Sequence, residues 1–385
     1  MSPRPAERMK NIPPSSTLRV LSLAKRLERE GRKILHLEVG EPDFDTPDHV
    51  KRAAWEALQR GMTKYTPSEG LPELREAVAE RVGAEAGNVL ITPGAKHAIF
   101  CAMEAILDPG EEVILPSPCW TYDGIVLSAG GRPVFLETRM EEGFRVDPGR
   151  LERALTPRTK LLVLNSPSNP TGAVLDEENL RAILELARER NLWILTDEIY
   201  DHLVYEGKSA SLLSLAGSLE GIVYINGFSK TYAMTGWRLG YAVAPKELVA
   251  EMNKIQQAST SCVPGFVQVA GLEALRGPQD FVERMREEFR RRRDFLVKGL
   301  SSLGLRCLPP QGAFYVFPRL PEGMGDSTRF CELLLEKAGI ASVPGAGFGP
   351  FGEGHVRFSF ACSMEVLRET LEKLGEFLRN LRTRG

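Results

Sequence analysis

The chain has 385 residues, of which 43% are hydrophobic, and its 49 basic and 51 acidic residues give a formal net charge of −2. Because these charges are balanced and interspersed, the sequence has no extended basic surface of the kind that nucleic acids or anionic membranes attract. No apolar run approaches the roughly 20 residues that span a bilayer, and residues 1–14 lack the apolar core of a secretory signal. The composition predicts a globular protein that binds neither nucleic acid nor membrane.

The cysteines and histidines carry little functional signal. Six cysteines are scattered without a Cys-x-x-Cys pair, and most lie in apolar stretches. This usage is typical of reduced, buried thiols in a cytoplasmic protein. The five histidines show no spacing suited to a metal, so we expect no metal site.

From residue 46 to 243, apolar segments of strand length alternate with amphipathic segments of helix length. Helices are predicted over residues 46–61, 71–82, 94–107 and 176–190, and strands over 89–92, 112–115, 133–137, 161–165, 192–196, 222–225 and 239–243. Short apolar strands between amphipathic helices are typical of a sheet covered on both faces. We therefore expect an α/β fold with a mainly parallel, seven-stranded-type sheet sandwiched by helices.

Long charged helices follow Pro245, the longest predicted over residues 278–303. It contains four consecutive arginines at 290–293, and Glu287 and Glu288 precede two of them by four residues. This is the spacing of ion pairs along a helix, so the run predicts a solvated, ion-paired face rather than an anion site.

The remaining segments predict a smaller α+β domain. Its elements are strand 313–317, helix 328–338, strand 355–360 and helix 364–381. The proline-marked N-terminal arm and strand 34–39 precede the alternating part, and we expect them to pack with this unit. The predicted domains are a large one over 46–289 and a small one over 1–45 and 290–385.

Polar motifs follow three of the predicted strands. Lys230 comes after strand 222–225, Asn169 after 161–165, and Asp197 after 192–196. Taken singly, these residues fit a surface lysine, a proline-rich turn and a helix cap. Together they lie where α/β sheets bind ligands, at the carboxyl ends of the strands.

Ser229, Lys230 and Arg238 together resemble the cofactor-attachment motif of the class I aminotransferases, in which a lysine forms an imine with the aldehyde of pyridoxal phosphate and an arginine binds its phosphate. A lysine amine converts an aldehyde into an imine, and the hydroxyl of Ser229 and the guanidinium of Arg238 match the acceptors of a phosphate. A fourth strand exit, at Gly94-Ala95-Lys96, opens a helix whose first amide groups are free to hold the same phosphate.

These motifs, in this order, resemble those of the class I aminotransferases of the aspartate aminotransferase superfamily. The resemblance runs from about residue 15 to the C-terminal helix and implies pyridoxal-phosphate-dependent fold type I. It implies that pyridoxal 5'-phosphate forms a Schiff base with Lys230. The other residues to which the resemblance assigns cofactor contacts are Gly94, Ala95, Lys96, Trp120, Asn169, Asp197, Tyr200, Ser229 and Arg238.

Within that set the resemblance gives individual roles. Asp197 keeps the ring nitrogen protonated, Asn169 and Tyr200 contact the phenolic oxygen, and Trp120 stacks on the ring. A lone tryptophan is more often a core residue. Tyr65 resembles the tyrosine that reaches the phosphate of a neighbouring subunit, which implies a homodimer with shared active sites.

The resemblance also implies how substrates bind. Arg357 would bind the substrate carboxylate together with the backbone amide of Gly40, beside Trp120 and Asn169. Lys96 and Thr17 occupy the positions at which bacterial and archaeal aspartate enzymes recognise the side-chain carboxylate. Lys96 equally fits a phosphate contact or the surface, and residues 259–261 lack the arginine that a better-known subgroup uses.

The implied reaction moves an amino group from an L-amino acid, with aspartate favoured, to a 2-oxo acid such as 2-oxoglutarate. Pyridoxamine phosphate carries the group, and Lys230 moves the proton. The sequence leaves open a broad-specificity, alanine or aromatic aminotransferase, or a lyase on the same fold. A regulatory pyridoxal phosphate protein of this family would add a DNA-binding domain, for which no residues remain. The Gly-x-Gly-x-x-Gly pattern at 347–352 leads into a predicted strand, which argues against a dinucleotide site.

Overall fold

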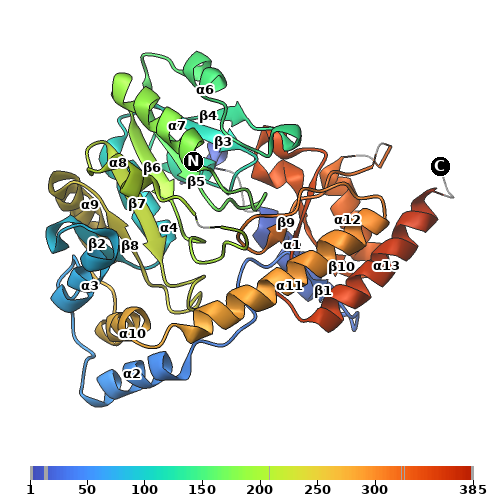
Figure 1. Cartoon of the computed structure of the whole chain (residues 1–385), viewed down its shortest axis with the longest axis horizontal. Helices are drawn as coiled ribbons and strands as arrows, with labels where there is room; N and C mark the ends of the chain where they lie inside the picture. Colours follow the sequence, from blue (N-terminus) through green and yellow to red (C-terminus); the bar gives the residue numbers. More distant parts are fainter. Residues whose placement is uncertain (1–2, 13–15, 208, 322, 325, 383–385) are drawn as a thin grey trace.

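The computed structural model describes residues 3–12, 16–207, 209–321, 323–324 and 326–382, without the side chains of Arg8, Ser16, Thr17 and Arg382 (Figure 1). A seven-stranded sheet forms its centre, in the order β2-β8-β7-β6-β5-β3-β4. The strands are β2 (Val89–Thr92), β3 (Glu112–Ser117), β4 (Arg132–Glu137), β5 (Thr159–Asn165), β6 (Trp193–Asp197), β7 (Ile222–Gly227) and β8 (Gly240–Val243). Only β8 in this sheet runs antiparallel to its neighbours, so the expected mainly parallel α/β sheet is confirmed.

Helices cover both faces of this sheet because successive strand residues are apolar on both sides. In β3, Val113 and Leu115 face one layer and Ile114 faces the other. One layer contains α4 (Ala95–Ile106), α5 (Asp123–Ser128) and α9 (Lys246–Ser259). The opposite layer contains α2 (Asp48–Gln59), α3 (Pro72–Val82), α6 (Pro148–Ala154), α7 (Glu177–Glu189), α8 (Leu212–Ala216) and α10 (Gly265–Arg276).

A second, smaller part lies beside this sheet. Its helices are α1 (Ser16–Arg29), α12 (Ser327–Ala338) and α13 (Met364–Arg382). Its strands are β1 (Leu35–His36), β9 (Tyr315–Val316), β10 (Ile340–Ala341), β11 (Val343–Pro344) and β12 (Val356–Ser359). Strand β1 pairs in parallel with β10, and β11, β12 and β9 form an antiparallel sheet. The N-terminal strand therefore packs with the C-terminal unit, as expected.

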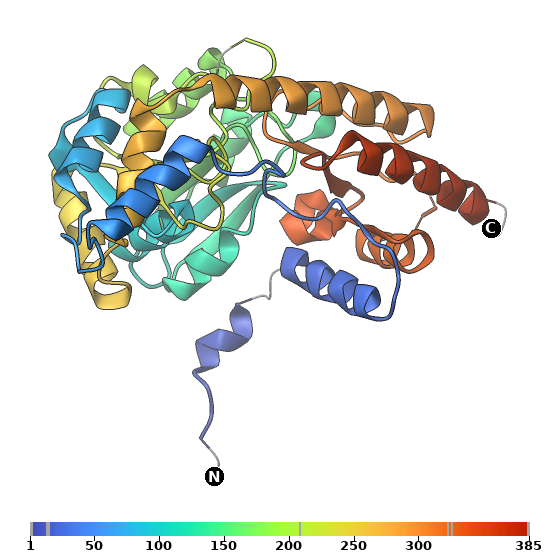
Figure 2. The same ribbon diagram turned by 90° about the horizontal axis from the view of Figure 1, so that it is seen from below.

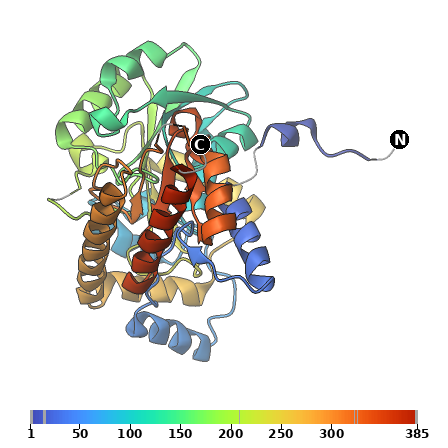
Figure 3. The same ribbon diagram turned by 90° about the vertical axis from the view of Figure 1, so that its right-hand side faces the viewer.

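The long helix α11 (Asp280–Ser302) runs from the large sheet to the smaller part and packs beside α13 (Figure 1). It passes without a break through residues 289 and 290, where the sequence places a domain boundary, and the division itself stays a prediction. Figures 2 and 3 show that η1 (Glu7–Asn11) projects from the rest of the molecule.

The prediction for the arginine run is wrong for two of its members. The side chains of Arg292 and Arg293 are only 8% and 6% exposed, because they face the body of the protein and pair with acids from other segments. Arg290 and Arg291, at 46% and 57%, form exposed ion pairs within the helix, but with the glutamates three residues before them rather than the expected four.

Other differences concern short elements. Helices α5, α6 and α8 have five to seven residues, too few to show a helical period in the sequence. Strand β9 spans two residues where five were expected, and the amide of Ala313, at the start of the expected strand, donates instead to the carbonyl of Leu203. In the described part of the chain, no helix has the length and apolarity needed to traverse a membrane. No group of His, Cys, Asp and Glu in the same residues is arranged to hold a metal.

Candidate active site

A cavity of about 320 Å³ opens where β5, β6 and β7 end. Eleven of the fourteen residues named from the sequence line it: Gly40, Ala95, Lys96, Trp120, Asn169, Asp197, Tyr200, Ser229, Lys230, Arg238 and Arg357. Gly94 lies just behind the lining, against the guanidinium of Arg238. Tyr65 is 90% exposed and lies outside the cavity of its own chain. Thr17 belongs to α1, and its side chain is outside the described residues.

Asp197, the last residue of β6, supplies a buried carboxylate. The hydroxyl of Tyr122 donates to its Oδ2 at 2.8 Å, and the amide of Ile199 donates to Oδ1 at 3.2 Å. Burial raises the pKa of Asp197 to about 6, against the opposing effects of these hydrogen bonds and of Lys230. A buried carboxylate with neutral hydrogen-bond donors favours a cationic ligand beside it.

Lys230 follows β7, the strand beside β6, and is partly buried in the cavity wall. Burial lowers the pKa of its ammonium to about 8, and Glu41 partly opposes this shift. Its Nζ donates to the carbonyl oxygen of Gly40. A lysine whose pKa lies near neutrality has a usable fraction of free amine, which is the form that acts as a nucleophile or base.

Arg357, from β12, faces Asn169 across the cavity. Its Nη1 donates to Asn169 Oδ1 at 2.9 Å, and its Nη2 donates to the carbonyl of Glu38 at 2.5 Å. The guanidinium lies 4.4 Å from the ring centre of Tyr315. Its buried Nε has no hydrogen-bond partner among the described residues, and burial lowers the pKa of Arg357. An anionic ligand would satisfy both the charge and this donor.

Two tyrosines connect the large sheet to the smaller part within the site: Tyr200 follows β6, and Tyr315 lies in β9. The hydroxyls of Tyr200 and Tyr315 lie 3.0 Å apart, and burial raises the pKa of both. The hydroxyl of Tyr315 would lie 2.6 Å from a Cβ placed on Gly40. A side chain at position 40 would therefore displace the hydroxyl of Tyr315 from its present place.

The rim of the cavity near α4 is built for an anion. A helix N-terminus presents amide groups that lack an intrahelical acceptor. Gly94 caps α4 with a φ of 85°, and a Cβ there would lie 2.5 Å from Arg238 Nη2. Arg238 Nη1 donates to the carbonyl of Thr235 at 2.8 Å. Lys96 Nζ lies 4.7 Å from the ring centre of Trp120, and burial together with Arg238 lowers the pKa of Lys96.

Residues 32–374 match the family model for aminotransferase class I and II. The chain belongs to this family. It is 48% identical over 383 residues to the aspartate/prephenate aminotransferase of Thermus thermophilus, covering 97% of this chain and 98% of that relative. It is 41% identical to the aromatic-amino-acid aminotransferase 2 of Thermococcus litoralis, covering 97% and 98%. The structure of the Thermus thermophilus aspartate aminotransferase with maleate superimposes with a TM-score of 0.94 at 46% identity, covering 98% of this chain and 100% of that one. The expected family, fold type I and enzyme class are confirmed.

The structure also brings to the site residues that the sequence motifs left unassigned. Tyr122 holds Asp197, and the Nδ2 of Asn165 donates to the Asp197 carbonyl while its Oδ1 accepts from the amide of Asn169. Tyr122 lies two residues after Trp120 and Asn165 four residues before Asn169, so a search around the named residues would find both. Tyr315 lies in an apolar segment with no polar neighbour to mark it.

Proposed function

We propose that this aminotransferase transfers the amino group of L-aspartate to a 2-oxo acid such as 2-oxoglutarate, with pyridoxal 5'-phosphate attached to Lys230. The convergence of Lys230, Asp197, Asn169 and Arg357 on one cavity carries the proposal. A relative named for aspartate, 48% identical over nearly the whole chain, supports this donor.

The cavity fits the cofactor at three points. The Asp197 carboxylate, paired in this chain with neutral donors, would hold a protonated ring nitrogen. Lys230 provides the amine, and the N-terminus of α4 with Ser229 and Arg238 provides donors for the phosphate. When bound, the cofactor accepts the electron pair that remains when the substrate's α carbon loses its proton.

The chain's own residues would bind the substrate and move its proton. Arg357 binds the α-carboxylate and gains a partner for its Nε. The Lys230 amine, whose pKa near 8 leaves part of it unprotonated at neutral pH, would take the proton from the α carbon and pass it to the aldehyde carbon of the cofactor. The buried hydroxyl of Tyr200 and the side-chain amide of Asn169 would hold the phenolic oxygen of the ring.

Among the described residues that line the cavity, we assign Lys96 to the distal carboxylate of aspartate. Its ammonium lies over Trp120, where its charge is partly desolvated and attracts an anion more strongly than at the surface. The predicted partner Thr17 stays a proposal from the sequence. Aromatic donors are the second candidate, because Leu18, Ile99 and Trp120 also line the cavity and one relative is named for aromatic amino acids.

We further propose that the enzyme is a cytoplasmic homodimer with shared active sites. Tyr65 supports the dimer, because a large side chain that is 90% exposed in one chain would gain contacts at a partner's phosphate site. Analytical ultracentrifugation should give a dimer, and Tyr65→Phe should weaken cofactor retention. A fully active monomer would contradict this part of the proposal.

Absorption spectra test the donor directly. The visible band of the loaded enzyme is recorded before and after adding aspartate, glutamate, alanine or phenylalanine, without an acceptor. Aspartate should convert the visible band to that of the pyridoxamine form.

Lys96→Met provides a second test. It should lower kcat/KM for aspartate about tenfold or more, as loss of a charged hydrogen bond implies, and leave kcat/KM for phenylalanine unchanged. Conversion by phenylalanine alone would establish the aromatic candidate, and products without a 2-oxo acid would indicate a lyase.

A further inference from the structure

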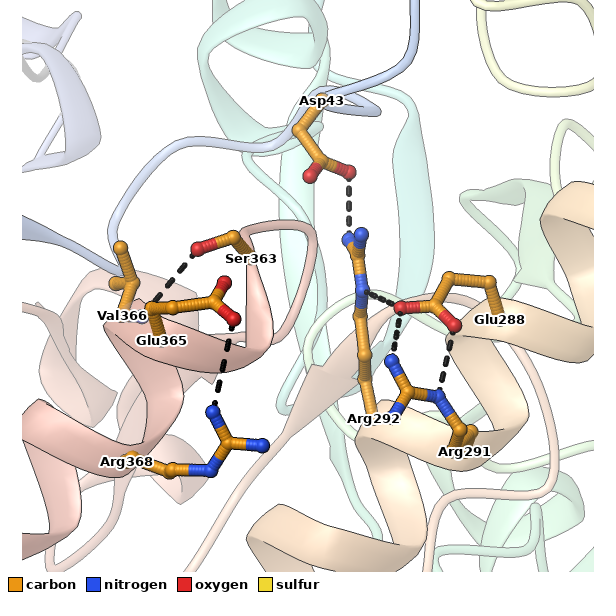
Figure 4. A network of polar contacts seen from close by, with 8 residues as sticks. All are labelled: Asp43, Glu288, Arg291, Arg292, Ser363, Glu365, Val366 and Arg368. Carbon is orange, nitrogen blue, oxygen red and sulfur yellow. Dashed lines mark hydrogen bonds and ion pairs between the residues drawn. The ribbon is translucent and has the colours of Figure 1, made fainter.

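Arg292 lies in the middle of α11 and connects that helix to a distant segment of the chain (Figure 4). Its Nη1 lies 2.6 Å from Asp43 Oδ1, and its Nε lies 2.8 Å from Glu288 Oε1. Glu288 is also bound by the exposed Arg291, at 2.8 Å. Arg292 is thus the member of this network that ties α11 to residue 43.

The segment that Arg292 holds begins in the active site. Residues 40–44 lead from Gly40, which lines the cavity and accepts a hydrogen bond from Lys230, to Asp43 and Phe44. The Gly40 backbone also passes close to the hydroxyl of Tyr315. A shift of this segment would therefore move backbone atoms on the wall of the cavity that contains Arg357.

A second contact fixes the same segment. The guanidinium of Arg292 lies 5.3 Å from the ring centre of Phe44, whose ring packs edge-on against Phe289 at 5.4 Å. Arg292 therefore holds both the charged and the aromatic residue at the end of the segment. The two contacts restrain its position and its orientation.

Stability alone gives little reason for an arginine here. Buried ion pairs lose in desolvation much of what they gain in attraction, and apolar side chains of similar volume often serve as well. The forked guanidinium does what an apolar side chain cannot, because it fixes the direction of Asp43 relative to α11. With a side chain only 8% exposed, Arg292 has little freedom to release it.

We propose that Arg292 is a positioning residue for substrate binding, which acts through Asp43 to hold residues 40–44 so that Gly40 lies beside Arg357 and Lys230. This rests on the proposed function, since it takes the substrate's α-carboxylate to bind between Gly40 and Arg357.

Arg292→Met tests the proposal with Arg291→Met as its matched control. Both variants remove one arginine from Glu288, but only the first releases Asp43. Arg292→Met should raise KM for the amino donor and the 2-oxo acid about tenfold, the coupling expected between groups in contact, and leave kcat within about twofold. The visible spectrum of the cofactor should not change. Arg292→Lys, which keeps the charge without the fork, should fall between Arg292→Met and wild type.

Asp43→Asn provides a second variant should Arg292→Met fail to fold. It should raise KM as Arg292→Met does, and the double variant should be no worse than the poorer single one. Equal KM values for Arg292→Met and Arg291→Met, or an unchanged KM in Asp43→Asn, would overturn the proposal. The assays use whichever donor the wild-type enzyme converts, so a failure on aspartate counts against the proposed donor and leaves this test intact.

Discussion

The two walls of the active-site cavity are built in different ways. The wall that would hold the cofactor consists of residues at the ends of neighbouring parallel strands, Asn169, Asp197 and Lys230 among them. The wall that would hold the substrate consists of Gly40, Tyr315 and Arg357, which come from short strands and a loop of the smaller part. The first is positioned by backbone pairing, and the second by contacts between side chains.

The register of the large sheet makes the first wall rigid. Asn165 pairs with Asp197, and Asp197 with Ile225, so the polar residues after each strand emerge at one level. On the second wall, Arg357 is placed by Asn169 and by the Glu38 carbonyl, and Gly40 by Tyr315 and by the segment that Arg292 holds. Single substitutions should therefore abolish chemistry on the first wall and loosen binding on the second.

The largest effect should come from Lys230→Ala. In the proposed mechanism this amine attaches the cofactor and moves the proton, so its removal should lower kcat by at least about 10⁴-fold, the upper range for one acid–base group. Single-turnover spectra with the best donor measure the loss. Lys254→Ala, at a side chain that is 67% exposed, serves as the control and should match wild type. Full activity in the Lys230 variant would remove the basis of the proposed mechanism.

Asp197→Asn should come next on the same wall. Loss of the buried carboxylate should lower kcat by about 10²–10³-fold, as for other preorganised electrostatic partners. The cofactor-free wild type should bind pyridoxal phosphate more weakly as the pH falls through about 6, where the pKa of Asp197 lies and the carboxylate becomes neutral. Fluorescence titrations across this range check the point. An Asn variant with the same pH dependence would assign the titration to another group.

The sequence predicted the first wall far better than the second. Asn169, Asp197 and Lys230 each follow an apolar strand, so strand order and local motif place them together without knowledge of the tertiary structure. Arg357 and Gly40 could be named only through resemblance to a family, because no local pattern brings residues 40, 315 and 357 into contact. The arginine run shows the same limit, since its helical spacing predicts the pair between Arg292 and Glu288 but not the pair between Arg292 and Asp43.

Tyr315→Phe should test the contact between the walls. It leaves the buried hydroxyl of Tyr200 without its partner, a cost of about 1–3 kcal/mol, so kcat/KM should fall about tenfold. Tyr205→Phe is the matched control, because Tyr205 is also buried and donates to a backbone carbonyl, that of Ala313, but does not line the cavity. Equal activity in the two variants would show that Tyr315 contributes only to packing.

The smallest effect should come from Glu198, which follows Asp197 but lines a different cavity with Arg81 and Asp201. Burial raises the pKa of Glu198 from 4.5 to about 8, although the amide of Leu212 and the hydroxyl of Thr196 donate to it. Between these two pH values the folded protein holds a proton that the unfolded chain has lost. This contribution to stability is complete below pH 4.5 and disappears as the pH rises through 8.

Glu198→Gln stays neutral throughout and should reduce the fall in melting temperature between pH 5 and 8, while kcat at neutral pH should stay near that of wild type. Calorimetry of the loaded enzyme at several pH values makes the comparison. An identical pH slope in the two proteins would place the proton elsewhere. A large loss of kcat would show instead that Glu198 acts on the active site through Asp197. The first wall would then include a residue that lines the cavity beside Arg81 and Asp201.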